Sequence, residues 1–84
     1  MSQPENVGGL TALQLKALGT EIKRCREGRN LSQGELGAAV SVSGAAICRY
    51  EAGSRQPDAT ILFKMEKVLH LPDYSLVRLL KPIG

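Results

Sequence analysis

The sequence predicts an all-α fold, built as one small domain of five short helices. Leu, Ile, Val and Ala dominate the apolar residues, and aromatic residues make up only 4% of the 84 positions. No segment alternates apolar and polar residues with the period of two that a half-buried strand requires. Capping residues instead precede apolar residues spaced three or four positions apart, which is the spacing of a helix face. The predicted helices span about 12–28, 33–40, 44–51, 58–69 and 74–80.

The first helix is predicted to begin after Thr11, because Thr11 and Gln14 can form a capping box. Gly19 lies in its middle and costs about 1 kcal/mol relative to alanine, so we expect another helix to approach closely there. Asn30 suits the left-handed conformation that follows many helices. The predicted apolar face of this helix is Leu15, Leu18, Ile22 and Cys25.

Two short helices joined by a tight turn are predicted within residues 31–51. Ser32 and Glu35 form a second capping box, which marks the start of the helix over 33–40. Ser43 is the N-cap candidate of the helix over 44–51, whose inward residues are predicted to be Ile47 and Tyr50. Such a pair of helices is the helix-turn-helix arrangement, in which the second helix enters the major groove of DNA.

The last two helices follow a polar loop. Asp58 is predicted to cap the fourth helix, and His70 is predicted to cap its C-terminal end ahead of Pro72. The fifth helix is predicted to open at Asp73 or Ser75. The predicted buried residues of the fourth helix are Ile61, Leu62, Met65, Val68 and Leu69.

Composition and charge exclude several classes of function. The net charge of +3 is compatible with binding nucleic acid. Cys25, Cys48 and His70 provide too few ligands for a structural zinc site, so we expect reduced thiols and no metal. No nucleophile and base, acid–base pair or phosphate-binding glycine loop is evident, so we expect neither an enzyme nor a cofactor.

The termini and hydropathy indicate a cytoplasmic protein without a membrane span. The polar, glycine-bearing residues 1–10 are predicted to be a disordered tail, followed by a single domain over 11–84. This N-terminus lacks the basic and apolar regions of a signal peptide. The longest nearly apolar run is too short to cross a bilayer.

The segment LSQGELGAAVSVSGAAICRYE (31–51) resembles the Cro/C1-type helix-turn-helix family, also called the XRE family. LGTEIKRCREGRNLSQ (18–33) resembles the first helix of that family and its exit. EAGSRQPDATILFKMEKVL (51–69) resembles its following loop and fourth helix. The resemblance covers about residues 12–80 and implies a compact lambda-repressor-like bundle that binds double-stranded DNA and regulates transcription.

The resemblance also implies DNA-contacting positions. The positions that face the groove in the family follow the turn serine, Ser43, and are predicted to be Gly44, Ala45, Ala46 and Arg49. Arg49 is the candidate reader of a guanine, with phosphate contact and solvation as alternatives.

Other positions are expected to contact the DNA backbone. Gln33, at a helix N-terminus, suits a phosphate and could also read a base through its amide. Ser32 is a further phosphate candidate, although the capping box occupies its hydroxyl. Arg55 matches a position that contacts the backbone in the family, whereas Lys23 and Arg24 are weaker candidates.

Arg26 and Glu51 are assigned a structural role by the same resemblance. In the family, an arginine at the position of Arg26 pairs with a glutamate at the end of the reading helix. Such a pair would orient that helix, and removing one buried partner costs several kcal/mol.

Three functions remain open at this stage. The first is a repressor that binds a two-fold operator as a homodimer, because one helix-turn-helix reads few base pairs. The others are an antitoxin that represses its own operon and binds a toxin, and an adaptor that binds protein, which the sparse Gly44-Ala45-Ala46 surface favours. The dimer surface is predicted on the C-terminal helix, although the same residues could complete the monomer core: Leu76, Leu79, Leu80 and Ile83.

Overall fold

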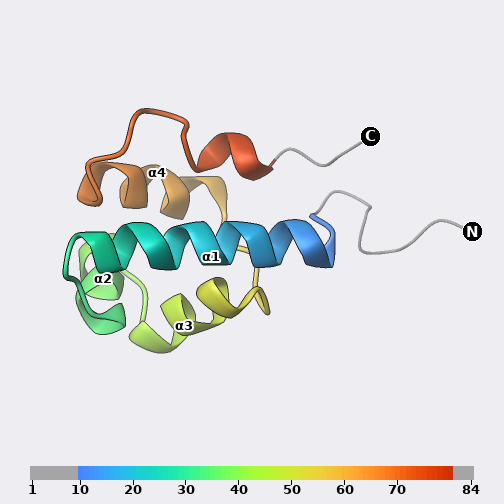
Figure 1. Ribbon diagram of the computed structural model, residues 1–84. Coiled ribbons are helices and arrows are strands. Elements are labelled where there is room, and N and C mark those ends of the chain that lie inside the picture. Colours follow the sequence, from blue (N-terminus) through green and yellow to red (C-terminus); the bar gives the residue numbers. More distant parts are fainter. Residues whose placement is uncertain (1–9, 81–84) are drawn as a thin grey trace, which may run out of the picture.

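The computed structural model describes residues 10–80, which form four α-helices and one short 3-10 helix (Figure 1). No strand occurs in this range, so the all-α prediction is confirmed. The first two helices match their predicted bounds, the third is one residue longer at its C-terminal end, and the fourth is one residue shorter at each end. The elements are α1 (Ala12–Gly28), α2 (Gln33–Val40), α3 (Gly44–Ala52), α4 (Ala59–Val68) and η2 (Val77–Leu80).

The long helix α1 lies across the molecule, with α3 on one side and α4 and the C-terminal segment on the other (Figure 1). Every α-helix turns an apolar stripe inward, so a single core holds the elements together. The core is formed by Leu10, Leu18, Ile22, Cys25, Leu36, Val40, Ala46, Ile47, Tyr50, Leu62, Met65, Leu69 and Leu76.

The start of α1 differs from the predicted boundary between tail and domain. Leu10, assigned to the tail, is only 2% exposed and belongs to the core, while residues 1–9 lie outside the described residues. Thr11 caps the helix in a capping box with Gln14, through hydrogen bonds of 3.0 and 3.2 Å. Leu10 therefore precedes the N-cap and packs in the same core as Leu15, the fourth helical residue, as in a hydrophobic staple.

The expected fifth α-helix is replaced by turns and a 3-10 helix. The Glu66 side chain, on α4, is buried and accepts backbone N–H groups of Tyr74, Leu76 and Val77 at 2.8 to 2.9 Å. Tyr74 also has a left-handed backbone, with φ of 67°, which an α-helix cannot accommodate. The prediction of an α-helix over 74–80 is therefore wrong, because a long-range bond to Glu66 sets the path of this segment.

Besides Tyr74, three residues that end helices are non-glycine residues in the left-handed conformation. Asn30 and His70 follow α1 and α4 with φ of 58° and 57°, as predicted for residues that end those helices. Ser41 ends α2 with φ of 66° and ψ of 38°. This conformation costs an L-residue about 1–2 kcal/mol, and glycine escapes the cost because it lacks a Cβ atom.

We therefore expect Ser41→Gly to stabilise the protein by up to about 1 kcal/mol, with the greater flexibility of unfolded glycine offsetting part of the relief. In a domain of this size the melting temperature should rise by about 4–8 °C per kcal/mol. Thermal unfolding followed by circular dichroism measures the change. The control is Ser54→Gly, outside the left-handed region, which should destabilise; a loss of stability in Ser41→Gly would contradict the interpretation.

Candidate nucleic-acid interface

The N-termini of α2 and α3 meet through two glycines. A Cβ atom on Gly44 would lie 3.2 Å from Gly34 Cα and 3.3 Å from Gly34 N. Because neither residue has a side chain, the first turns of the two helices approach with their backbones nearly in contact. The positive ends of two helix dipoles are thus placed side by side, which favours an anion such as a phosphate.

Serine side chains cap both N-termini. Ser32 Oγ accepts the backbone N–H of Glu35 at 3.0 Å, and Glu35 Oε1 accepts the N–H of Ser32 at 2.8 Å. Ser43 Oγ accepts the N–H of Ala46 at 3.0 Å. Each cap serves the third helical residue, so the N–H groups of the first two residues of each helix remain available to an anion.

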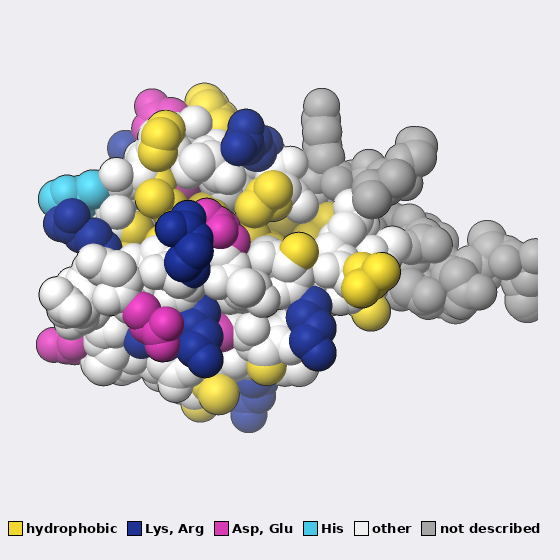
Figure 2. Space-filling model, viewed as in Figure 1, with side chains coloured by type: hydrophobic (Ala, Val, Ile, Leu, Met, Phe, Trp, Pro, Cys, Tyr) yellow, Lys and Arg dark blue, Asp and Glu magenta, His cyan; other side chains and the backbone are white. Residues whose placement is uncertain are grey.

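The exposed face of α3 carries little hydrogen-bonding chemistry. Ala45, Cys48, Arg49 and Ala52 are exposed, at the three- and four-residue spacing of one helix face. This face lies at the lower edge of the space-filling view, where yellow and dark-blue side chains stand over α3 (Figure 2). Arg49 is therefore the only long polar side chain on the exposed surface of this helix.

Ala46 was predicted to face the groove, and the structure corrects its position. Its side chain is 5% exposed and belongs to the core with Ile47 and Tyr50. Consecutive residues on an α-helix are rotated by about 100°, so Gly44, Ala45 and Ala46 cannot all share one face. Ala45 is exposed, and Gly44 is half-buried against α2.

Cys48 and Ala52 lie on the same exposed face, although sequence reasoning did not place them there. Both positions follow from Ala45 by steps of three and seven residues, which is the signal that could have found them. Cys48 is a free, exposed thiol, whereas Cys25 is a free thiol within the core. Burial raises the pKa of the Cys25 thiol, so it stays protonated.

A buried ion pair fixes α3 against α1. Arg26 Nε and Nη2 donate to the two oxygens of Glu51 at 2.5 and 3.0 Å, and the Arg26 and Glu51 side chains are only 10% and 4% exposed. Arg26 Nη1 donates to the carbonyl of Leu31 at 2.7 Å. The hydrogen bond that Arg26 donates to Glu51 raises the pKa of Arg26, which stays charged. The pair thus joins the exit of α1 to the end of α3.

Gln33 belongs to the same network. Its Nε2 atom donates to Glu51 Oε1 at 3.1 Å, so the carboxylate receives three hydrogen bonds. This contact fixes the first residue of α2 relative to α3. The amide nitrogen of Gln33 is consequently engaged within the protein, whereas its backbone N–H is free at the helix start.

The remaining basic candidates differ in their partners. Arg55 is exposed in the loop after α3, and its guanidinium lies 5.9 Å from the centre of the Tyr50 ring. Arg24 instead forms a bidentate pair with Glu21, at 3.1 and 2.5 Å. The hydrogen bond from Arg24 lowers the pKa of Glu21. Arg55 and Lys23 thus lack an acidic partner among residues 10–80, whereas Arg24 has one.

Comparison with known proteins agrees with this arrangement. A family model described as Helix-turn-helix matches residues 22–74. A regulator from Bacillus subtilis (strain 168), named uncharacterized HTH-type transcriptional regulator YqaE, is 35% identical over 60 residues, which cover 71% of this chain and 49% of that protein. The chain therefore spans about half the length of the curated relative it matches.

Two solved structures share the fold, each with a TM-score of 0.65. One is the P22 c2 repressor in complex with a synthetic operator, 29% identical, covering 70% of this chain and 89% of the repressor chain. The other is Bacillus thuringiensis PlcR in complex with the peptide PapR7 and DNA, 28% identical, covering 76% of this chain and 21% of PlcR.

The chain belongs to the Cro/C1-type helix-turn-helix family. The family match spans α2 and α3 entirely, together with the part of α1 that carries Arg26. Within residues 10–80, no helix is long and apolar enough to cross a membrane.

Proposed function

We propose that this chain is a sequence-specific DNA-binding regulator of transcription, acting as a repressor with α3 in the major groove. The observation that carries the proposal is the exposed face of α3 beside two capped, closely packed helix N-termini. In this arrangement the N–H groups at the start of α2 bind a phosphate while α3 meets base edges. The likeness to the P22 c2 repressor, whose structure is a complex with a synthetic operator, supports DNA as the partner.

Arg49 is the proposed base reader. It is exposed on α3, and its guanidinium can donate two hydrogen bonds to a guanine, worth about 1–3 kcal/mol of discrimination. Ala45 can contact a thymine methyl. Four positions at the two helix N-termini are proposed to approach the DNA backbone: Ser32, the N–H of Gln33, Ser43 and Gly44. Arg55 is proposed to contact a DNA phosphate. Ala46 is not proposed again, because it lies in the core.

Selection of bound duplexes from a random pool tests this proposal, with the wild type and Arg49→Ala compared. The wild type should select two inverted half-sites, and Arg49→Ala should lose the preference at one position of each half-site while the others persist. Arg55→Ala removes an equal charge that the proposal assigns to a phosphate, so it should weaken binding to every duplex and leave the selected sequence unchanged. An identical consensus from wild type and Arg49→Ala would refute the assigned role of Arg49.

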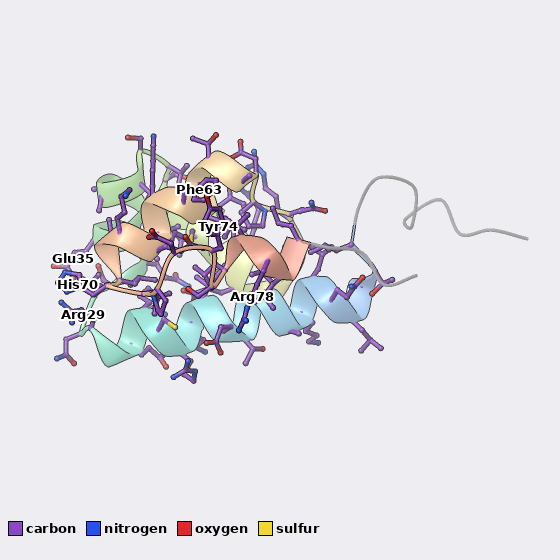
Figure 3. The ribbon with its side chains drawn as sticks, turned by 90° about the horizontal axis from the view of Figure 1, so that it is seen from above. Arg29, Glu35, Phe63, His70, Tyr74 and Arg78 are labelled. Carbon is purple, nitrogen blue, oxygen red and sulfur yellow. The ribbon has the colours of Figure 1, made fainter. Side chains whose placement is uncertain are left out.

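A homodimer would place two copies of α3 on a two-fold operator. We propose its interface on α4 and the C-terminal segment, where Phe63 and Tyr74 are 37% and 60% exposed and pack edge to face at 5.4 Å (Figure 3). Leu79 is also exposed there, at 37%. Leu76 was predicted to belong to the dimer surface, but it is buried in the core of the monomer and is not part of the proposed interface. Leu80 packs against the core, and Ile83 lies outside the described residues.

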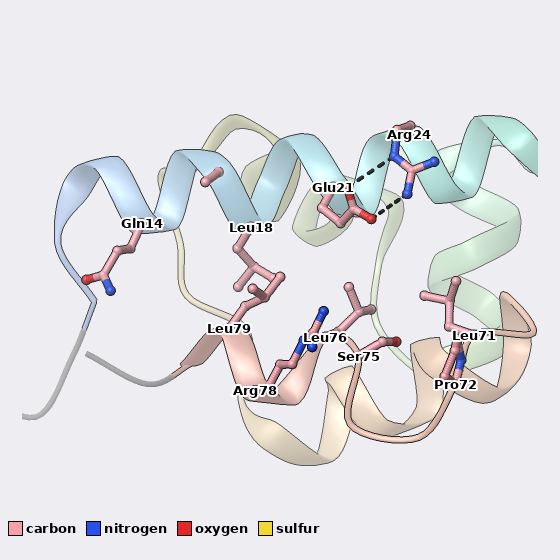
Figure 4. Close-up of a pocket in the computed structure, with 11 residues that line it drawn as sticks. Gln14, Leu18, Glu21, Arg24, Leu71, Pro72, Ser75, Leu76, Arg78 and Leu79 are labelled. Carbon is pink, nitrogen blue, oxygen red and sulfur yellow. Dashed lines mark hydrogen bonds and ion pairs between the residues drawn. The ribbon is translucent and has the colours of Figure 1, made fainter. Parts of the chain in front are cut away.

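A protein partner is the second candidate function, as a toxin bound by an antitoxin or the target of an adaptor. A groove of about 660 Å³ favours it; this groove runs between α1 and the C-terminal segment, over Leu18 and Leu76 (Figure 4). Salt dependence separates this function from the first. If the chain binds DNA, the logarithm of its affinity should fall against the logarithm of the salt concentration with a slope of about −0.9 per phosphate contact. Absence of binding to any duplex at low salt would favour the adaptor.

A further inference from the structure

The short supply of hydrogen-bonding groups on α3 raises the question of which residues provide affinity for the DNA backbone. The helix N-termini of α2 and α3 provide one phosphate site. The helix α1, which packs against the C-terminal half of α3, carries the densest group of basic residues in the chain. In Figure 2, dark-blue side chains stand along α1 and continue toward α3 at the lower edge.

Two glycines bring α1 into backbone contact with the C-terminal half of α3. A Cβ atom on Gly19 would lie 2.4 Å from the carbonyl oxygens of Tyr50 and Glu51. A Cβ atom on Gly53, which ends α3, would lie 3.0 Å from Lys16 Cα. Lys16 therefore emerges from α1 where the two helices touch, next to the loop that carries Arg55.

Lys16 and Lys23 flank this contact on the surface of α1. They lie three residues before and four residues after Gly19, so all three share one side of the helix. Both lysines are exposed, and neither takes part in the ion pairs formed within residues 10–80. Their separation of seven residues places them about 10 Å apart along the helix axis.

The acidic groups near this side of α1 leave Lys16 without a carboxylate neighbour on its own helix. Glu51 is buried with Arg26, and Glu21 is paired with Arg24 on a different side of the helix. Glu27 shares the side of Lys23, four residues later, and lies 3.9 Å from Arg26 with 59% of its side chain exposed. No acidic residue lies three or four positions from Lys16 on α1, which suits the charge of Lys16 to a polyanion.

We propose that Lys16, with Lys23 one turn beyond the contact, forms a second phosphate-binding row on α1, in addition to the phosphate site at the α2 N-terminus. The proposal rests on the proposed function, because it requires α3 to occupy the major groove. Ammonium groups bind phosphates as point charges without reading sequence. This row therefore adds affinity to every duplex equally and leaves the choice of operator to Arg49.

The test compares Lys16→Gln with the matched variant Lys64→Gln, which removes the same charge from an exposed position on α4. Affinity for a selected duplex and for a random duplex is measured between 50 and 200 mM salt. Lys16→Gln should reduce the salt slope by about 0.9, so the wild type should lose about 3–4 times more affinity than Lys16→Gln over this range. Both duplexes should respond alike.

Each outcome separates this inference from the proposed function. If the wild type binds DNA with a steep salt slope but Lys16→Gln and Lys64→Gln have equal slopes, the row on α1 is refuted and the regulator function stands. If the wild type binds neither duplex at low salt, both proposals fall. A loss confined to the selected duplex would also overturn the inference, because it would make Lys16 a base reader.

Discussion

Glu51→Gln is expected to lower the free energy of unfolding by about 3–5 kcal/mol. The substitution keeps the size of the side chain but removes the charge, and it leaves the Arg26 guanidinium buried without its counter-ion. It also weakens the acceptor for Gln33. Small domains are stable by only about 5–15 kcal/mol, so this variant should unfold at a much lower urea concentration than the wild type.

Glu27→Gln is the matched control. Glu27 also lies near Arg26, at 3.9 Å, but its side chain is 59% exposed. Exposed ion pairs contribute about 0–1 kcal/mol, so this variant should remain close to the wild type in a urea titration. Equal stability of Glu51→Gln and the wild type would contradict the structural role assigned to the buried pair.

The second large effect is expected from Gly19→Ala. In an isolated helix this change stabilises by about 1 kcal/mol, because alanine is the better helix former. Here the added Cβ atom would lie 2.4 Å from two carbonyl oxygens of α3, and backbone atoms cannot rotate away as a side chain can. We therefore expect a loss of about 3 kcal/mol or more, at the upper end of the cost of overpacking.

Gly28→Ala separates steric clash from helix propensity. Gly28 is the last residue of α1, and a Cβ atom there would meet nothing within 4 Å. This variant should be as stable as the wild type or slightly more stable in chemical denaturation. If Gly19→Ala gained stability as well, α1 and α3 would not be in the backbone contact that the site requires.

Local patterns were sufficient to predict most of the fold. Ser32, Ser43 and Asp58 each cap the helix that follows, and a side-chain oxygen three residues before the bonded N–H determines this geometry. Ser41 stands at the turn position where the family usually has glycine, so its left-handed conformation was implied by family resemblance and not by a local pattern. The C-terminal segment could not be predicted, because it depends on Glu66, eight to eleven residues earlier in the chain.

The candidate site was predicted less completely than the fold. Exposure of Arg49 follows from its helical spacing, and the Arg26–Glu51 pairing was implied by family resemblance. The rotation of about 100° between consecutive helical residues means that Gly44, Ala45 and Ala46 cannot share one face, so the number of base-facing positions was overestimated. The bond from Gln33 to Glu51 could not be predicted, because it depends on how α2 packs against α3.

The central claim is that this domain binds DNA chiefly through phosphates, with Arg49 as the main reader of sequence. Affinities for a selected duplex and for a scrambled duplex of equal length, titrated from 50 to 200 mM salt, test it most directly. The account predicts that the affinity for both duplexes falls steeply as salt rises. It also predicts that the affinity for the selected duplex exceeds that for the scrambled duplex by a factor of about 10³, which is the low end for specific binders. A preference near about 10⁷, or no binding to either duplex at low salt, would contradict it.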